Sequence, residues 1–368
     1  MFKFRLARLL GGLLLIAPLM LLWSGELQPT QAQSPPLSRI VCPAGYTTGL
    51  FSEGLTSPDG LAFDPAGRLY VVEEGAGQVS RVAADGSTTL VLSGLRSPEG
   101  ITFDSAGTLL VVEDVSDGRV VSRAGDGITR TLSSGLSYPE GVAWLAGENG
   151  PDRLYVTESN LEAAGLGSGD NLSNYLTYLT EIEPLSGQVT RIYTQTPVIK
   201  SLNPVIVELW SYAGLTAGTD GRLYVTNELA GLTLTGMATL GGPAINFTAE
   251  SKVGVVSLDP QADASPPTFL ASALTTPEGI RFTAEGHFPL YVAEENTDPS
   301  SLSTGRISQI AADGTVTHLC SGFGSIEDVV VDEQGVLYVS EDSSGSIIAI
   351  TPPWKAGQVV YLPVILHR

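Results

Sequence analysis

Residues 97–114 read Ser97-Pro98-Glu99-Gly100-Ile101-Thr102-Phe103-Asp104-Ser105-Ala106-Gly107-Thr108-Leu109-Leu110-Val111-Val112-Glu113-Asp114. This stretch predicts a turn, a short apolar strand, a tight turn and a second apolar strand. One carboxylate precedes the first predicted strand, and another ends the second. The unit is too short to bury a core alone. Its recurrence along the chain indicates that several copies pack together to form one.

Five further copies of this pattern are present, two of them degraded. They begin at Pro58, Pro139, Tyr212, Pro277 and Ile326. The first three copies are spaced by 40 and 41 residues, and the later intervals are 73, 65 and 49. A period near 40 residues with several short strands per repeat is typical of a β-propeller. The sequence therefore predicts an all-β fold, a six-bladed β-propeller.

The N-terminal strand is expected to close the ring. Residues 46–55 match the outer strands of later copies, but they come before any copy has begun. The last copy lacks such a strand. We expect the first strand to complete the last blade, because closure hides sheet edges that would otherwise invite aggregation.

The predicted domains are a signal peptide (1–32), a linker (33–45), the propeller (46–353) and an apolar tail (354–368). Basic residues precede an apolar run at 9–23, and Thr-Gln-Ala at 30–32 offers a cleavage site. The run is short for a membrane span. We expect a secreted or periplasmic product with no span after cleavage. The tail is expected to be an extra strand, a packed tail or an attachment signal.

The chain carries a formal net charge of −20, and its only cysteines are Cys42 and Cys320. Such a charge repels nucleic acid and anionic lipid, and it favours cationic partners. In an oxidising compartment Cys42 and Cys320 could pair as a staple across the closed ring, or both could stay free.

Long insertions fall in the third, fourth and fifth blades, at 159–174, 228–251 and 295–304. In an up-and-down blade these loops leave from the face on which the Pro-Glu-Gly turn enters. We expect this face to bind a small molecule or an extracellular protein, because loops on rigid scaffolds commonly carry function.

Acidic residues recur at two positions of the repeat. Before the innermost strand stand Asp59, Glu99, Glu140, Ala213, Glu278 and Glu327. At the end of the second strand stand Glu73, Glu113, Glu158, Asn227, Glu294 and Glu341. Carboxylates crowded at a channel mouth must bind a cation, become protonated or find basic partners. Candidate basic partners are Arg119, Lys252, Arg281 and Arg306.

Oxygen ligands without clustered His or Cys indicate Ca²⁺ ahead of Mg²⁺ or Mn²⁺, and they argue against Zn²⁺. The expected ligands are Glu99, Glu140, Glu278, Glu327, Glu341 and Asn227. The alternative is structural, since such carboxylates often accept hydrogen bonds from turn N–H groups. The three histidines fall away from the acids, so a His general base is not expected; Glu140 would be the base of an enzyme.

The motif Pro-[Asp/Glu]-Gly-x-x-Phe-Asp-x-x-Gly-x-Leu-Tyr-Val-x-Glu resembles the NHL and gluconolactonase-like six-bladed propellers. The leader, the Ser-Gly-Leu outer strands and the Glu-rich repeats look most like the ScyD/ScyE family, exported propellers associated with scytonemin biosynthesis clusters. The gluconolactonase resemblance implies a metal held by one Glu, two Asn and one Asp. This chain departs from that set, because Glu replaces most of the Asn and the fourth blade offers Ala213.

These observations favour an exported binding or scaffold protein with an acidic, Ca²⁺-binding pocket on the loop-bearing face. The alternative is a metal-dependent hydrolase of the lactonase type, with Glu99, Glu278 and Glu341 as ligands and Glu140 as base.

Overall fold

The computed structural model describes residues 37–147, 150–160, 176–196, 198–202, 205–208, 210–229, 232–235, 244–247, 254–260, 267–272, 274–295 and 304–355. The expected signal peptide, most of the expected tail and Lys252 lie outside these residues. So do most of the expected loops, at 161–175, 236–243 and 296–303.

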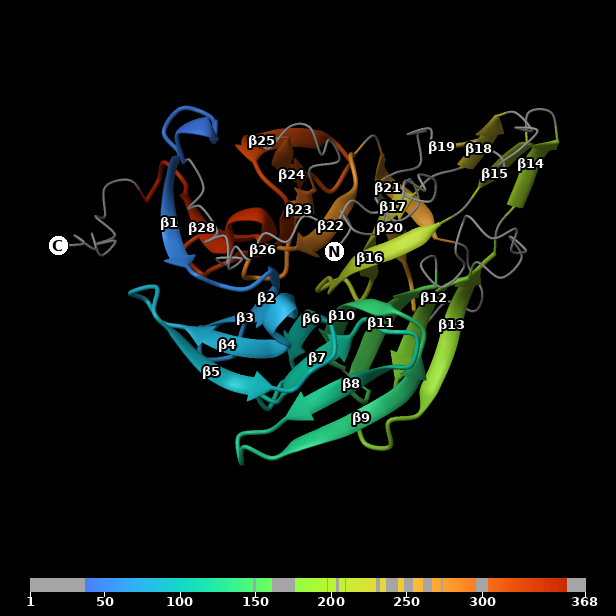
Figure 1. Cartoon of the computed structure of the whole chain (residues 1–368), viewed down its shortest axis with the longest axis horizontal. Helices are drawn as coiled ribbons and strands as arrows, with labels where there is room; N and C mark the ends of the chain where they lie inside the picture. The colour runs from blue at the N-terminus through green and yellow to red at the C-terminus, as the bar shows by residue number, and fades with distance from the viewer. Residues whose placement is uncertain are drawn as a thin grey trace, which may run out of the picture.

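The described residues form six four-stranded antiparallel blades around a common axis (Figure 1), which confirms the six-bladed β-propeller. The innermost strands are β2 (Pro58–Phe63), β6 (Pro98–Phe103), β10 (Pro139–Leu145), β16 (Ser211–Ala217), β22 (Pro277–Arg281) and β26 (Ile326–Val331). The second strands are β3 (Leu69–Glu73), β7 (Leu109–Glu113), β11 (Arg153–Ser159), β17 (Leu223–Leu229), β23 (Leu290–Glu294) and β27 (Leu337–Glu341).

The outer half of each blade completes the sheet. The third strands are β4 (Gln78–Val82), β8 (Gly118–Arg123), β12 (Thr177–Ile182), β20 (Gly254–Leu258), β24 (Gly305–Ile310) and β28 (Ser346–Thr351). The outer strands are β5 (Thr88–Ser93), β9 (Thr129–Leu136), β13 (Val189–Gln195), β21 (Thr268–Ser272), β25 (Val316–Phe323) and β1 (Thr47–Glu53). The second strands lie deepest, and in β3, β7 and β23 every residue is buried.

The ring closes through its N-terminal strand. β1 pairs antiparallel with β28, and Figure 1 shows the blue β1 beside the red β28. Before β1, the 3₁₀ helix Leu37–Arg39 leads to a backbone bridge between Val41 and Ser321 of β25. Cys42 forms a disulfide with Cys320 in that same outer strand. The N-terminal segment therefore joins blade six to blade five.

Gly100 shows why the innermost strands can lie against one another around the axis. A Cβ at Gly100 would lie 2.2 Å from the carbonyl oxygen of Glu140 on the next blade. No side chain fits there, so the Pro-Glu-Gly glycine lets neighbouring blades approach. Blade six departs from this rule and carries Asp328 at the corresponding position.

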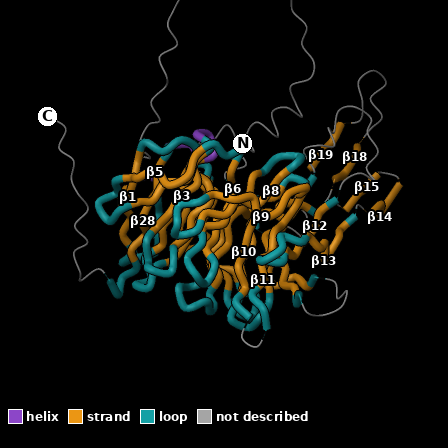
Figure 2. The backbone as a smooth tube through the Cα atoms, turned by 90° about the horizontal axis from the view of Figure 1, so that it is seen from below, coloured by secondary structure: helices purple, strands orange, loops and turns teal. Residues whose placement is uncertain are grey.

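A further sheet was not expected from the sequence. Its strands are β14 (Val198–Leu202), β15 (Val205–Glu208), β18 (Leu232–Thr235) and β19 (Ala244–Phe247), in that order. It lies at the edge of the ring in both views (Figures 1 and 2). Part of the length that the sequence assigned to loops therefore forms strands.

The remaining helical structure is short. The 3₁₀ helices Glu74–Ala76 and Asp342–Ser344 follow β3 and β27. Among the described residues, no helix combines the length and the apolar character that crossing a membrane requires.

Candidate functional site

An acidic pocket of about 70 Å³ lies where the innermost strands begin. Among the described residues, eight carboxylates and a single guanidinium, that of Arg281, line it. The lining carboxylates are Asp59, Glu74, Glu99, Glu140, Glu278, Glu327, Asp328 and Asp342. Repulsion among so many like charges in a partly buried space favours protonation or a bound cation.

The first predicted set of carboxylates lines this pocket: Asp59, Glu99, Glu140, Glu278 and Glu327 all contribute. A shift of register in each innermost strand places them. In β6, for example, Pro98 pairs with Glu113 and Ile101 pairs with Val111, so Glu99 and Gly100 lie in a bulge. Bulges re-aim side chains, and this one directs the carboxylate toward the axis. Blade four contributes Ala213 and Gly214 instead.

The second predicted set has a different location. Its six members are buried at the ends of the second strands and do not line the pocket. Each accepts a backbone N–H from the start of its own innermost strand, either from the turn before the strand or, for Asn227, from its first residue; we call this contact the turn clasp. The six bonds are Thr56 N–H to Glu73, Arg96 N–H to Glu113, Ser137 N–H to Glu158, Ser211 N–H to Asn227, Thr275 N–H to Glu294 and Gly324 N–H to Glu341.

Three of the clasp carboxylates pair with arginines. Two of these arginines, Arg119 and Arg306, are among the expected basic partners. Arg119 pairs with Glu113, Arg306 with Glu294, and Arg191 with Glu158. Glu341 instead accepts from Ser344 Oγ, and Asn227 accepts Ser211 N–H at 3.0 Å. The structure therefore does not bring Glu341 or Asn227 together with the other expected ligands. Their contacts match the structural alternative, in which such groups hold turns.

The residues that sequence reasoning missed follow the clasp residues directly. Glu74 and Asp342 line the pocket, and Asp114 joins Glu99 and Glu140 in a close cluster. Glu228 and Glu295, at the same repeat position, are buried and act electrostatically on Glu278. The sequence pattern that could have identified them is the recurring acidic pair, such as Glu73-Glu74 and Glu113-Asp114. Only the first member of each pair was predicted to be part of the site.

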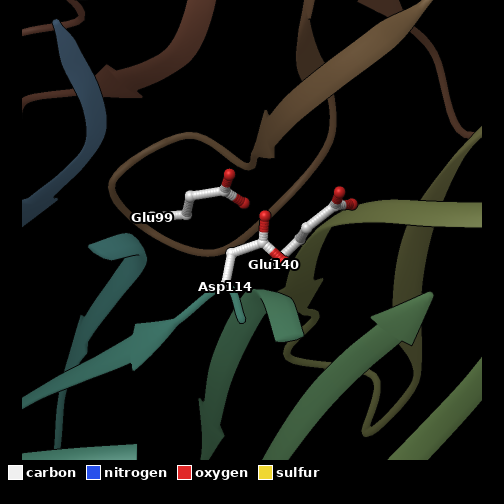
Figure 3. Close-up of side chains that lie close together, drawn as sticks. All are labelled: Glu99, Asp114 and Glu140. Carbon is white, nitrogen blue, oxygen red and sulfur yellow. The ribbon is translucent and has the colours of Figure 1, made fainter. Parts of the chain in front are cut away.

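The closest convergence of carboxylates among the described residues joins blades two and three. One ligand oxygen from each of Glu99, Asp114 and Glu140 lies within 4.8 Å of the other two. Figure 3 shows the three side chains close together; Glu99 belongs to β6, Asp114 directly follows β7 and Glu140 belongs to β10. Glu99 and Asp114 are buried. Three carboxylates form the hard-oxygen donor set that Ca²⁺ and Mg²⁺ prefer, so these residues fit such an ion.

The other side of the pocket holds carboxyl groups with raised pKa values. Burial raises the pKa of Glu278 well above its ordinary value, and the nearby Glu228 and Glu295 raise it further. Burial also raises the pKa of Glu327 and of Asp59, again with help from neighbouring carboxylates. Within the described part of the chain, the Oε1 atom of Glu278 is buried without a hydrogen-bond partner.

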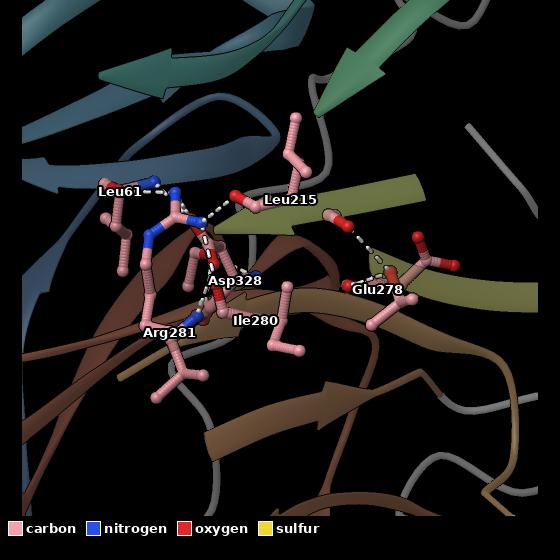
Figure 4. A network of polar contacts seen from close by, with 10 residues as sticks. Leu61, Leu215, Glu278, Ile280, Arg281 and Asp328 are labelled. Atoms are coloured by element: carbon pink, nitrogen blue, oxygen red, sulfur yellow. Dashed lines mark hydrogen bonds and ion pairs between the residues drawn. The ribbon is translucent and has the colours of Figure 1, made fainter. Parts of the chain in front are cut away.

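Arg281 and Asp328, which line the pocket, also form a network of polar contacts (Figure 4). Arg281 donates to the carbonyls of Leu215, Ile280 and Leu61 and to Asp328 Oδ2 at 3.0 Å. Asp328 also accepts Leu61 N–H at 3.0 Å. This network links blades one, four, five and six across the axis. The Arg281 guanidinium charge is paired with the Asp328 carboxylate.

Comparisons with known proteins agree with the architecture. The sequence matches no protein-family model and no curated protein significantly. Many solved structures share the fold. A gluconolactonase from Xanthomonas campestris superposes with a TM-score of 0.58 at 15% identity, over 84% of this chain and 90% of that one.

Two further solved structures are similar. The holo PQQ domain of pyranose dehydrogenase from Coprinopsis cinerea gives a TM-score of 0.56 at 16% identity, over 85% of this chain and 97% of that one. A calcium structure of a Trichoderma reesei enzyme of carbohydrate-active family AA12 gives 0.53 at 16% identity, over 89% and 99%. The chain has a gluconolactonase-like propeller fold. At such identities the likeness extends to fold alone.

Proposed function

We propose that this chain is an exported binding or scaffold propeller that holds a divalent cation, Ca²⁺ ahead of Mg²⁺ or Mn²⁺, in its axial pocket. The convergence of Glu99, Asp114 and Glu140 carries the proposal. Their oxygens come from two neighbouring blades, and two of the three residues, Glu99 and Glu140, also line the acidic pocket. Three converging carboxylates are a donor set that suits Ca²⁺.

Export is supported by the basic and apolar leader in the sequence and by the disulfide between Cys42 and Cys320. Disulfides persist in oxidising compartments. The formal charge of −20 suits a partner that is itself cationic or that approaches through a bound cation. We include in this proposal that the chain is a ScyD/ScyE-like exported propeller, as the sequence motifs suggest.

Calorimetric titration of the metal-stripped protein tests the cation site. Ca²⁺ should bind and raise the melting temperature, since saturation at 100 times Kd adds about 2.7 kcal/mol of stability. The double substitution Glu99→Gln/Glu140→Gln should weaken binding by about two orders of magnitude, because two of three ligand charges are lost.

Glu285→Gln is the matched control, because Glu285 is an exposed carboxylate in the turn between β22 and β23, away from the pocket. Its Ca²⁺ affinity should equal that of the unmodified chain. Absence of both binding heat and a melting shift at millimolar Ca²⁺ would contradict the cation site.

A metal-dependent hydrolase of the lactonase type is the second candidate. It is favoured by Glu140, which belongs to the carboxylate cluster and also lines the pocket with Glu278. A divalent cation held there would polarise a substrate carbonyl, and Glu140 would act as base by taking a proton from the attacking water. Turnover of lactones or esters that needs Ca²⁺ and disappears in Glu140→Gln would establish this candidate over the non-catalytic one.

A further inference from the structure

Glu113 differs from the other turn-clasp residues in its partners. Its side chain is fully buried, and both carboxylate oxygens accept hydrogen bonds from Arg119, at 2.8 and 2.9 Å. Arg96 adds its backbone N–H at 3.1 Å and its Nε at 2.9 Å. Among the clasps of the described residues, this is the one with two arginine side chains. Charge-assisted hydrogen bonds from two arginines therefore hold this strand end to the turn before β6.

This clasp adjoins the carboxylate cluster in sequence. Glu113 immediately precedes Asp114, and Arg96 begins the turn that leads into Glu99. The Asp114 N–H donates to the carbonyl of Ser97 at 2.8 Å and so locks these two segments together. Two of the three cluster residues are thus anchored through Glu113.

The third cluster residue is linked to the same loop. The N–H of Val115 donates to the Glu113 carbonyl at 3.0 Å, and the Val115 carbonyl accepts the N–H of Tyr138 at 3.0 Å. Tyr138 begins the Tyr-Pro-Glu turn that presents Glu140. A continuous series of backbone hydrogen bonds therefore runs from Glu113 to the innermost strand of blade three.

The turns held in this way are conformationally unfavourable by themselves. Ser97 has φ +42° and Tyr138 has φ +48°, in the left-handed region that residues other than glycine rarely adopt. Such conformations persist where surrounding contacts over-determine them. The clasp and its hydrogen-bonded loop supply those contacts.

Resting on the proposed cation site, we propose that Glu113 is a positioning residue, which with Arg96 and Arg119 holds Glu99, Asp114 and Glu140 at cation-binding separation. Glu113 also has an electrostatic effect. Its charge occupies two guanidinium groups that would otherwise be released next to Asp114. Released guanidinium groups would pair with the cluster carboxylates and compete with a cation.

Glu113→Gln tests this role, with Glu294→Gln as the matched control. Glu294 is also a buried clasp residue with an arginine, Arg306, and a turn N–H, that of Thr275. The residue after it, Glu295, lies outside the cluster. The readouts are Ca²⁺ affinity by calorimetry on the full chain and the melting temperature without metal. Both variants should lower the melting temperature, and Glu113→Gln alone should weaken Ca²⁺ binding, by tenfold or more.

Glu113→Asp separates geometry from charge and guards against a Glu113→Gln variant that fails to fold. It keeps the charge but withdraws the carboxylate by one methylene, so its Ca²⁺ affinity should fall between that of the Glu113→Gln variant and that of the unmodified protein. Affinities within twofold of the unmodified chain for both Glu113 variants, or equal losses in the Glu113 and Glu294 variants, would overturn the positioning role. No Ca²⁺ binding by the unmodified chain would overturn the proposed function itself, and the positioning role with it.

Discussion

At the scale of single residues, neighbouring acids in one repeat have opposite environments. Glu113 is buried against arginines, whereas Asp114 turns toward Glu99 and Glu140. Burial alone would raise the pKa of Glu113, but the hydrogen bonds from Arg119 and Arg96 lower it below its ordinary value. Glu278, whose Oε1 has no hydrogen-bond partner among the described residues, has a raised pKa. The sequence shows which side chains are acidic, but it does not show which group each acid contacts.

The raised pKa of Glu278 predicts a pH dependence of stability. Above the ordinary carboxyl pKa of about 4.3, the unfolded chain releases a proton that the folded chain retains. The free energy of unfolding should therefore fall as pH rises above this value toward the raised pKa of Glu278 in the folded chain. Glu278→Gln should flatten this slope and stabilise the protein at the higher pH values. Urea unfolding at several pH values, in buffer that contains a chelator, measures this dependence. Parallel curves of unfolding free energy against pH for the unmodified chain and the Glu278→Gln variant would contradict the expectation.

At the scale of elements, the repeat determined blade geometry wherever the motif was intact. Residues 46–55 matched outer strands and became β1 of blade six. The strands β14, β15, β18 and β19 escaped prediction because they lie between motif copies, in sequence without repetition. Short apolar runs of this kind do not distinguish strands from loops without a partner.

Gly100→Ala tests the close approach of the innermost strands. The added Cβ would lie 2.2 Å from the Glu140 carbonyl oxygen, which is backbone and cannot swing aside. We expect a loss of about 1–3 kcal/mol in unfolding free energy, as for overpacked cores. Gly125→Ala is the control, since nothing lies within 4 Å of a Cβ there. Equal denaturant midpoints for the two variants would refute this explanation.

At the scale of the whole molecule, contacts across the axis and across the closure hold the ring. Arg281 and Asp328, at the wall of the pocket, tie four blades together. Both residues break the repeat, since other blades have small or apolar residues and glycine at these positions. The closure adds β1 and the disulfide between Cys42 and Cys320, 278 residues apart in sequence.

Removing the disulfide should destabilise the ring. A cross-link over so long a segment restricts the unfolded chain, and its loss commonly costs about 2–4 kcal/mol. The double substitution Cys42→Ser/Cys320→Ser should lower the urea midpoint accordingly, while leaving Ca²⁺ affinity unchanged because the cysteines lie in the outer strand region, away from the pocket. An unchanged midpoint would show that β1 pairing alone suffices.

The sequence by itself determined the propeller, its closing strand and the ring of carboxylates before the innermost strands, because these features follow from local repetition. Tertiary structure alone decided which partners each member of an acidic pair meets. Glu113 meets Arg96 across a turn, 17 residues away in sequence, and Asp114 meets Glu140 of the next blade. Such partners are set by how strands and blades are brought together in space, which a repeat pattern does not encode.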